Sequence, residues 1–225
     1  MPIPKTVNQD FFKTWSPEMA YVLGFFAADG SMCRTRRDTH FIDFYVTDRP
    51  LLVNIRRALG ANHKISKRVR RYPWKAAYHL QIGSKEIFRD LERLGMTQGK
   101  SLSIRMPKVP RKYFSNFLLG YFDGDGCVHL GRYWHKDRRR WRWQLMVVFT
   151  SGSKNFLKDL WAALRPWVTG GRLGSKTRGY ELVFSQHDSF ALFKLMYHNA
   201  PARLLLERKR KIFLKALKIL NAGVV

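Results

Sequence analysis

The sequence has few acidic residues. Only 16 Asp and Glu stand against 42 Lys and Arg in 225 residues, which leaves a formal net charge of +26. A surplus of that size destabilises a compact protein by self-repulsion unless a polyanion neutralises it. We therefore expect a nucleic acid as the partner.

Cysteine and long apolar runs are scarce as well. Cys33 and Cys127 are too few for a disulfide framework or a four-cysteine zinc site, and they fit an intracellular, reducing compartment. No apolar run approaches the ~18 residues of a membrane-spanning helix, and the first residues lack the apolar region of a signal peptide. We expect no membrane partner. Hydrophobic residues still make up 45% of the chain, enough for a real core.

One segment occurs twice. Residues 23–30 (LGFFAADG) return as residues 119–126 (LGYFDGDG), at an offset of 96. Two further pairs follow in the same order at offsets of 103 and 102: residues 44–47 with 147–150, and residues 78–82 with 180–184. Matches in a conserved order indicate a duplicated protein with pseudo-twofold symmetry.

The first unit has a legible order of elements. Ser16 and Pro17 predict the start of a helix that runs through residues 19–28, and strands are expected at 31–37 and 40–47. A helix at 50–59, strands at 64–71 and 75–82 and a helix at 85–94 follow. Residues 100–112 form a connector to a second such unit, whose helix begins near Tyr113, and a basic helix at 204–220 ends the described pattern. We expect two domains, 1–106 and 114–225, joined by a linker at 107–113.

The repeated segment alone could be an ordinary amphipathic helix that ends at Asp-Gly. Its duplication favours a second interpretation. Gly24 and Gly120 lie at the centre of small-residue faces, so the two helices can pack closely. Asp29 and Asp125 would then lie side by side at helix C-termini, where the dipole is unfavourable for an acid. A divalent cation between the two carboxylates relieves this unfavourable electrostatic interaction, and carboxylate ligands suit Mg²⁺.

Residues 22–30 and 118–126 resemble the paired signature of the LAGLIDADG homing endonucleases in their single-chain, two-repeat form. The resemblance covers residues 16–220. It implies an α+β monomer of two αββαββα units, whose antiparallel sheets form a saddle over duplex DNA with the signature helices at the interface. It also implies a double-strand break across the minor groove with short 3′ overhangs. The target would be long, and asymmetric or weakly palindromic.

The resemblance assigns roles to individual residues. Asp29 and Asp125 fall on the metal-binding acids, with Mg²⁺ as cofactor, Mn²⁺ as a substitute and Ca²⁺ bound without supporting cleavage. Lys100 and Lys209 match the lysines that polarise the scissile phosphate or its water. The position that often holds a glutamine near the active water carries Asp48 in one unit and Ser151 in the other.

Alternate positions of the predicted strands would face DNA, because a two-stranded ribbon fits the major groove. In the first unit these positions are Ser31, Cys33, Thr35, Arg37, Asp43, Tyr45, Arg68 and Arg70. In the second unit they are Cys127, His129, Gly131, Tyr133, Arg142, Gln144, Arg172, Lys176 and Arg178. The run 135–143 is expected to be a hairpin tip that follows backbone phosphates, with an aromatic stacking platform for single strands as the alternative.

A different class of function is open at this point. The same basic scaffold suits an RNA maturase that acts on intron RNA, or a regulator that binds DNA without cutting it. Two carboxylates set against helix dipoles favour the endonuclease, since a pure binder gains nothing from them.

Overall fold

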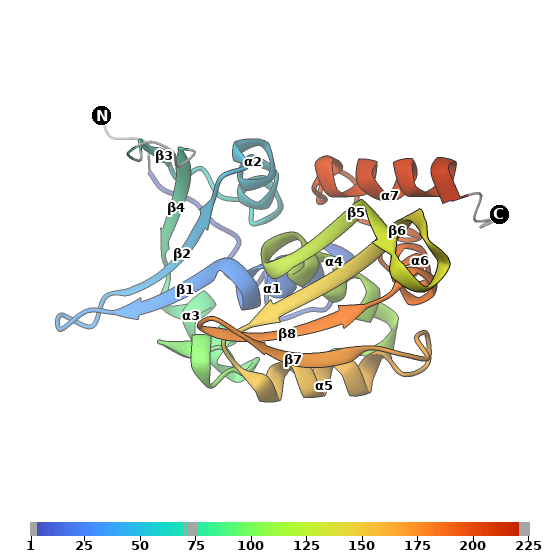
Figure 1. The fold of residues 1–225 in the computed structure, drawn as a ribbon. Helices are drawn as coiled ribbons and strands as arrows, with labels where there is room; N and C mark the ends of the chain where they lie inside the picture. The colour runs from blue at the N-terminus through green and yellow to red at the C-terminus, as the bar shows by residue number, and fades with distance from the viewer. Residues whose placement is uncertain (1–3, 70, 72–75, 221–225) are drawn as a thin grey trace.

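A computed structural model of the chain describes residues 4–69, 71 and 76–220. The first half runs in the order helix, hairpin, helix, hairpin, helix (Figure 1). Its elements are α1 (Pro17–Asp29), β1 (Gly30–Arg34), β2 (His40–Val46), α2 (Arg49–Ala58), β3 (Ile65–Arg68), β4 (Ala77–Gly83) and α3 (Lys85–Arg93). The connector holds two 3₁₀ turns, η1 (Lys100–Leu102) and η2 (Arg111–Tyr113).

The second half repeats this order and adds one helix. Its elements are α4 (Phe114–Asp125), β5 (Gly126–His135), η3 (Lys136–Arg138), β6 (Arg140–Ser151), α5 (Lys154–Leu164), β7 (Arg172–Lys176), β8 (Gly179–Phe184), α6 (Gln186–Tyr197) and α7 (Glu207–Leu220). Each half forms one antiparallel sheet, with strand order β1-β2-β4-β3 and β5-β6-β8-β7. The predicted α+β fold of two pseudo-symmetric αββαββα units is confirmed.

Local signals start several of the helices. The Ser16 hydroxyl accepts a hydrogen bond from the Met19 N–H at 3.0 Å and so caps α1, while Pro17 occupies a first-turn position that needs no donor. Ser84 and Ser153 cap α3 and α5 in the same way. The caps of α1 and α3 explain why these two helices begin where the sequence predicts.

The helices α1 and α4 lie side by side at the centre of the molecule (Figure 1). Two glycines make this possible. A Cβ on Gly24 would lie 2.0 Å from the carbonyl oxygen of Phe117, and one on Gly120 would lie 2.0 Å from that of Tyr21. Any side chain at either position would therefore separate the two backbones. The predicted close packing of the repeated helices is confirmed.

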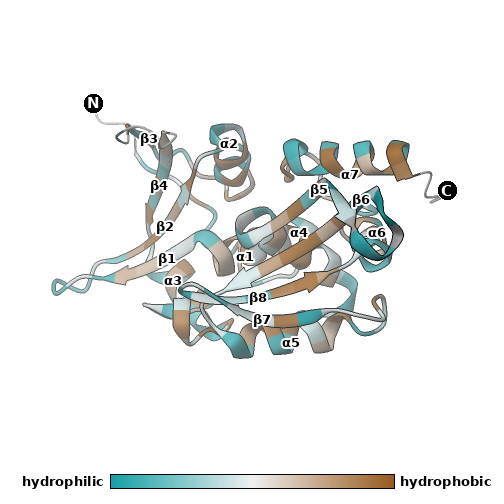
Figure 2. Cartoon of the chain, viewed as in Figure 1, coloured by the Kyte–Doolittle hydropathy of each residue, from teal (hydrophilic) through white to brown (hydrophobic). Residues whose placement is uncertain are grey.

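Burial alternates along the strands and gives each sheet two distinct faces. In β2, the side chains of Ile42, Phe44 and Val46 are buried in the core, while those between them are half-buried on the other side. The second sheet does the same with Leu145, Val147 and Phe149 of β6. We call the side away from these core residues the outer face. Figure 2 shows that the hairpins β1–β2 and β5–β6 are hydrophilic at the ends that lie away from the hydrophobic centre of the molecule.

Several predicted bounds were wrong. β3 ends at Arg68 and not at residue 71. β1 ends at Arg34 and not at residue 37, because the chain turns at Thr35, whose N–H donates to the Thr39 carbonyl at 2.9 Å. The last helix begins at Glu207 and not at residue 204. There the Leu204 N–H bonds back to Pro201, and Arg203 adopts a positive φ of 68°, which a helix does not allow.

Within the parts of the chain that the structure describes, no helix combines the length and the apolar character that crossing a membrane requires.

Candidate active site and nucleic-acid interface

Asp29 and Asp125 are the last residues of the paired helices α1 and α4. Each is followed by a glycine, Gly30 or Gly126, at which the backbone becomes extended and the first strand begins. Neither helix carries a basic residue in its last turn. Both carboxylates therefore meet the negative end of their own helix dipole without compensation from that helix.

The electrostatics of the two acids are coupled. Burial, together with the negative charge of Asp125, raises the pKa of Asp29 to about 6. The pKa of Asp125 is also raised, chiefly by burial, against the lowering effect of Lys100 and Lys209. The structure thus brings together the two acids that the sequence predicted, in a place that favours a cation between them.

Lys100 and Lys209 supply the positive charge that the helices lack. The buried Lys100 ammonium donates a hydrogen bond to the carbonyl of Gly30. The Lys209 ammonium donates to the carbonyl of Gly126 at 2.7 Å, to that of Asp123 at 3.0 Å, and to that of Phe122. Burial lowers the pKa of both lysines, that of Lys209 to about 8. The two lysines thus contact equivalent carbonyls, one after each acid.

Asp123 makes the second helix end different from the first, where Ala27 stands at the matching position. Its carboxylate is 3% exposed and accepts from the Tyr21 hydroxyl at 2.7 Å and from the Leu206 N–H at 2.9 Å. Burial raises its pKa to about 6. Asp123 therefore joins α4 to α1 and to the segment before α7, a role that the sequence did not reveal.

Asp48 and Ser151 lie at matching places near the end of the second strand of each unit, but their contacts differ. Asp48 pairs with Arg208 at 3.0 Å and lines a cavity of about 260 Å³ together with Asp29 and Asp123. Ser151 is buried at the end of β6, where its hydroxyl accepts from the Ser153 N–H at 3.1 Å. Asp48 thus shares a cavity with a signature acid, whereas Ser151 serves the loop before α5.

The two carboxylates fit a hard cation that takes most of its ligands from water or phosphate oxygens. Among the described residues, no group of three or more His, Cys, Asp or Glu side chains lies close enough to hold a metal ion. The protein therefore offers the carboxylate oxygens of Asp29 and Asp125, and water or phosphate oxygens must complete the coordination shell. Mg²⁺ is characteristically bound in this way.

The outer face of the first sheet is polar. Ser31, Cys33, Asp43, Tyr45 and Arg68 all lie on it, as the alternation predicted. Sequence analysis missed further residues of this face, among them Phe41, Ser66, His79 and Gln81. The register of β4 places His79 and Gln81 opposite Tyr45 and Asp43, and alternation along residues 78–82 was the signal that could have found them.

His79 and Gln81 hold the Asp43 carboxylate. The His79 Nε2 atom lies 2.6 Å from Asp43 Oδ1, and the Gln81 amide donates to the same oxygen at 3.0 Å. The Arg68 guanidinium lies over the Tyr45 ring, 5.5 Å from its centroid. These contacts fix polar groups in a defined pattern, as direct readout of base edges requires.

The outer face of the second sheet carries the residues predicted for it on the strands. They are Cys127, His129, Gly131, Tyr133, Arg142, Gln144, Arg172 and Lys176. The strand pairing also places Met146, Val148, Glu181 and Val183 on this face, which sequence analysis did not name.

Three predicted contact residues lie in turns and not on strands. Thr35 and Arg37 lie in the turn between β1 and β2, and Arg178 lies in the turn between β7 and β8 with a φ of 63°. The strand assignment was wrong for Thr35 and Arg37, because the first hairpin turns at Thr35, earlier than the sequence pattern suggests. Arg178 lies in the second hairpin of its unit, where it was expected. Arg70 lies outside the described residues.

The sequence matches one family model and parts of several known proteins. A model of the LAGLIDADG-like domain matches twice, at residues 16–95 and 113–193. The chain is 46% identical over 65 residues to the probable translation initiation factor IF-2 of Thermococcus kodakarensis, covering 27% of this chain and 5% of that protein. It is 29% identical over 121 residues to the reverse gyrase of Methanocaldococcus jannaschii, covering 54% and 7%. The chain thus spans a small part of these relatives.

Solved structures with similar folds cover nearly the whole chain. The I-AabMI meganuclease bound to uncleaved DNA matches with a TM-score of 0.63 and 14% identity, covering 92% of each chain. The I-SmaMI homing endonuclease bound to cleaved DNA gives the same TM-score and identity over 92% of this chain and 90% of its own. A structure of I-SmaMI with calcium ions matches with a TM-score of 0.58, at 12% identity, over 92% and 90%. At these identities the likeness shows a shared fold.

Proposed function

The chain belongs to the LAGLIDADG-like family, and on that premise we propose that it is a site-specific endonuclease of double-stranded DNA. It hydrolyses one phosphodiester in each strand across the minor groove and leaves short 3′ overhangs. It acts as a monomer on a long target that is asymmetric or weakly palindromic, because the two outer faces differ in sequence. The domains run from 1–106 and 114–225, with the linker at 107–113.

One observation carries this proposal: Asp29 and Asp125 are desolvated at the ends of two helices that pack without side chains between them. The charge of one raises the pKa of the other. An arrangement that destabilises both carboxylates has a purpose only if a cation and a phosphate group bind there.

Asp29 and Asp125 hold the divalent metal, for which Mg²⁺ is the natural choice, Mn²⁺ a substitute and Ca²⁺ a ligand that does not support cleavage. When bound, such a metal lowers the pKa of a water and stabilises the attacking and leaving oxygens of the phosphodiester. Each acid serves one strand, because the two come from units related by the pseudo-twofold axis.

Lys100 and Lys209 act as fixed positive charges beside the acids and the phosphate. Both lower the pKa of Asp29 and of Asp125, so they keep the carboxylates ionised and ready for the metal near neutral pH. Asp48 and Ser151 flank the site at the position after each second strand. Asp48 is placed to orient water in the 260 Å³ cavity that it shares with Asp29.

Recognition falls to the outer faces. Arg68, Arg172 and Lys176 bring positive charge to the duplex, while Asp43, held by His79 and Gln81, offers an acceptor for a cytosine amino group. A part of these contacts goes to phosphates, which position the duplex without reading sequence.

A maturase or a regulator is disfavoured by the same observation. Binding of intron RNA or of an operator needs the basic surface, and it gains nothing from two acids with raised pKa values at the centre of that surface. The DNA complexes among the solved structures of this fold point in the same direction.

The test is a selection of cleaved sequences from a randomised DNA library in Mg²⁺, repeated with EDTA. We expect one recurrent site, and a plasmid that carries it should be linearised in Mg²⁺ and left intact in EDTA. A protein that binds the library without cutting any member in Mg²⁺ or Mn²⁺ would be a binder, and the proposal would be wrong.

A further inference from the structure

The two hairpins that begin at the signature helices differ in length. β1 and β2 form five residue pairs, from Gly30 to Arg34, and the Thr35 to Thr39 bond adds a sixth. β5 and β6 form ten, from Gly126 to His135. The second hairpin is therefore four pairs longer, which corresponds to ~13 Å at ~3.3 Å per residue.

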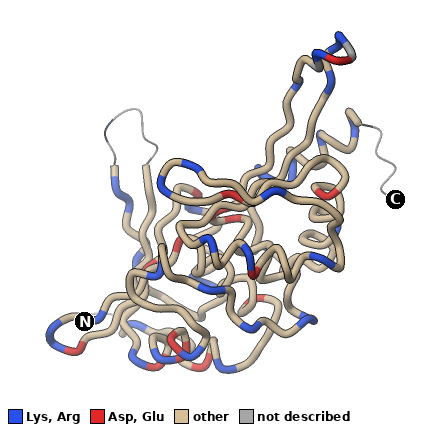
Figure 3. The backbone as a smooth tube through the Cα atoms, turned by 60° about the horizontal axis from the view of Figure 1, so that its bottom comes forward, with Lys and Arg blue, Asp and Glu red and all other residues tan. Residues whose placement is uncertain are grey.

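The added length lies away from the active site. Both hairpins start at the C-terminal end of a signature helix, next to Asp29 or Asp125, so each further pair lies farther from the centre. We call the four added pairs and their turn, residues 132–143, the finger. Figure 3 shows it projecting from the body of the molecule, with basic residues at its tip.

Aromatic residues stabilise the finger on the side opposite its outer face. Trp134 and Trp141 are cross-strand partners with ring centroids 5.9 Å apart in an edge-to-face arrangement. The Arg132 guanidinium lies over the Trp141 ring, 6.0 Å from its centroid. Such pairs stabilise a hairpin without help from a core. They explain why rings that are 48% and 57% exposed occur here, and they leave the outer face to Tyr133 and Arg142.

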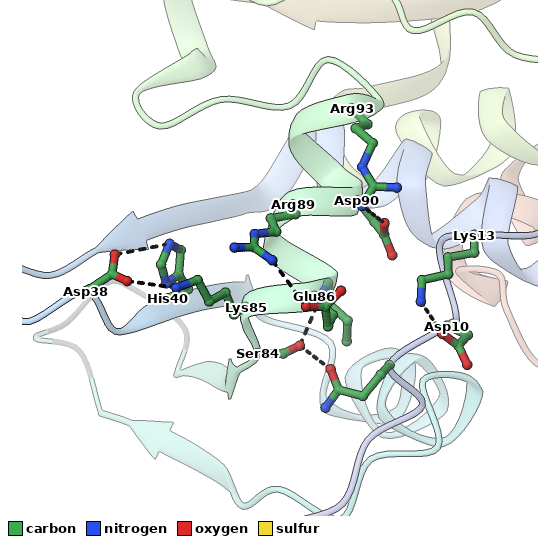
Figure 4. A network of polar contacts seen from close by, with 12 residues as sticks. Asp10, Lys13, Asp38, His40, Ser84, Lys85, Glu86, Arg89, Asp90 and Arg93 are labelled. Atoms are coloured by element: carbon green, nitrogen blue, oxygen red, sulfur yellow. Dashed lines mark hydrogen bonds and ion pairs between the residues drawn. The ribbon is translucent and has the colours of Figure 1, made fainter.

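Charge at the two hairpin ends differs as well. In the first hairpin, Asp38 pairs with Arg34 at 2.6 Å. It also pairs with Lys85 of α3 at 2.9 Å (Figure 4). That tip is therefore partly neutralised and tied to its own body. The finger carries six Lys and Arg against one acid, Asp137, whereas residues 34–39 of the first hairpin carry three Arg against one acid, Asp38. Lys136, Arg139 and Arg140 are exposed, so the finger presents the larger positive charge.

From this difference we propose that the finger lengthens the half-site bound by the second repeat. The finger contacts backbone phosphates of the duplex that flanks the cleaved centre. Its contacts lie about four base pairs farther from that centre than those of the first hairpin, because ~13 Å corresponds to about four base-pair steps of ~3.4 Å. The partner is B-form DNA outside the cleaved centre. This inference rests on the proposed function, because the duplex must lie along both outer faces.

The footprint of the bound protein on its selected site tests the inference. With Ca²⁺ in place of Mg²⁺, hydroxyl-radical protection should extend about four base pairs farther from the cleavage position on one side than on the other. Lys136→Ala/Arg139→Ala/Arg140→Ala should remove that extension and make the negative slope of log K against log salt shallower by about 3. The matched control, Arg36→Ala/Arg37→Ala, should leave the longer side unchanged.

Three outcomes are distinct. Equal half-sites in the unmodified protein, or an extension that survives the triple substitution, would overturn the inference while the endonuclease stands. Protection of an added single strand, lost in Trp134→Ala/Trp141→Ala but kept in the triple variant, would make the finger a stacking platform and would also overturn it. Failure to select any cleaved site would overturn the proposed function and this inference with it.

Discussion

The two halves of the molecule reach the same active-site geometry with different supporting residues. In the first, Lys100 from the connector after α3 binds the carbonyl of Gly30. In the second, Lys209 from the additional helix α7 binds the equivalent carbonyl of Gly126. The lysine lies 71 residues after its aspartate in one half and 84 in the other. The requirement is therefore for a buried ammonium group at the helix end, whichever segment supplies it.

The second half also carries constraints that the first lacks. Asp123 ties α4 to Tyr21 and to Leu206, and Lys209 contacts three carbonyls where Lys100 has one described. α7 is thus held to α4 by polar contacts at its start, close to Asp125. We infer that the second half is the more rigidly defined side of the site, and the changes below test this difference.

The largest effect is expected where the halves are alike. Gly24→Ala places a Cβ 2.0 Å from the Phe117 oxygen and Gly120→Ala does the same at Tyr21, so each should lower the free energy of unfolding by roughly 3 kcal/mol or more. Urea titration followed by circular dichroism measures this. Gly174→Ala, whose Cβ meets nothing closer than 3.9 Å, is the control and should change stability little. Equal effects at all three positions would contradict the close helix contact.

Asp123→Ala makes the second helix end like the first. It leaves the Tyr21 hydroxyl and the Leu206 N–H buried without an acceptor, so unfolding free energy should fall by about 2 kcal/mol. Asp123→Asn keeps one acceptor oxygen for both donors and should retain most of that stability. Thermal melts of the two variants measure the difference. If the alanine variant is as stable as the asparagine variant, the Asp123 hydrogen bonds between the halves contribute nothing to stability.

Asp29→Asn should stabilise the metal-free protein. The pKa of Asp29 is about 6 in the folded chain against an ordinary 3.8, so the folded state holds the proton more tightly, and stability is lost as pH rises from about 4 to 6. Asparagine removes that loss, which gives a gain of roughly 3 kcal/mol at pH 7 and none at pH 3. Melts in EDTA across this range measure the difference, and a pH-independent gain would contradict it.

The smallest effect concerns the lysines. Lys209 is the first of the two lysines to lower the pKa of Asp29, and Lys100 is the first to lower that of Asp125. Lys209→Met should therefore move the acidic limb of cleavage of one strand upward by a fraction of a pH unit, and Lys100→Met that of the other strand. Strand-resolved initial rates report both, with exposed Lys211→Met as the control. Identical shifts in both strands would show that the lysines are not specific to one acid.

The sequence predicted what depends on local periodicity. The duplication placed Asp29 and Asp125 at equivalent helix ends, and alternation placed Ser31, Cys33 and His129 on the outer faces. The unequal hairpins were not predicted, although the change of offset from 96 to 103 between the repeated segments was a signal of them.

Contacts between residues that are far apart in the sequence could not be predicted from such local patterns. The Asp123 to Tyr21 bond joins residues 102 positions apart, and the His79 to Asp43 contact joins residues 36 apart. Each depends on how helices or strands come together. The contact of Lys209 with helix carbonyls was missed for the same reason, although the residue itself was identified through the family resemblance.

The central claim is that Asp29 and Asp125 form one divalent-metal site that cuts both strands. Its most direct test is strand-resolved cleavage of the selected site by Asp29→Asn and by Asp125→Asn in Mg²⁺, beside binding in Ca²⁺. We predict that each substitution lowers the rate of double-strand cutting at least about 100-fold, while the affinity for the site stays within a few-fold of that of the unmodified protein. Linear product from both variants at the unmodified rate would contradict the claim.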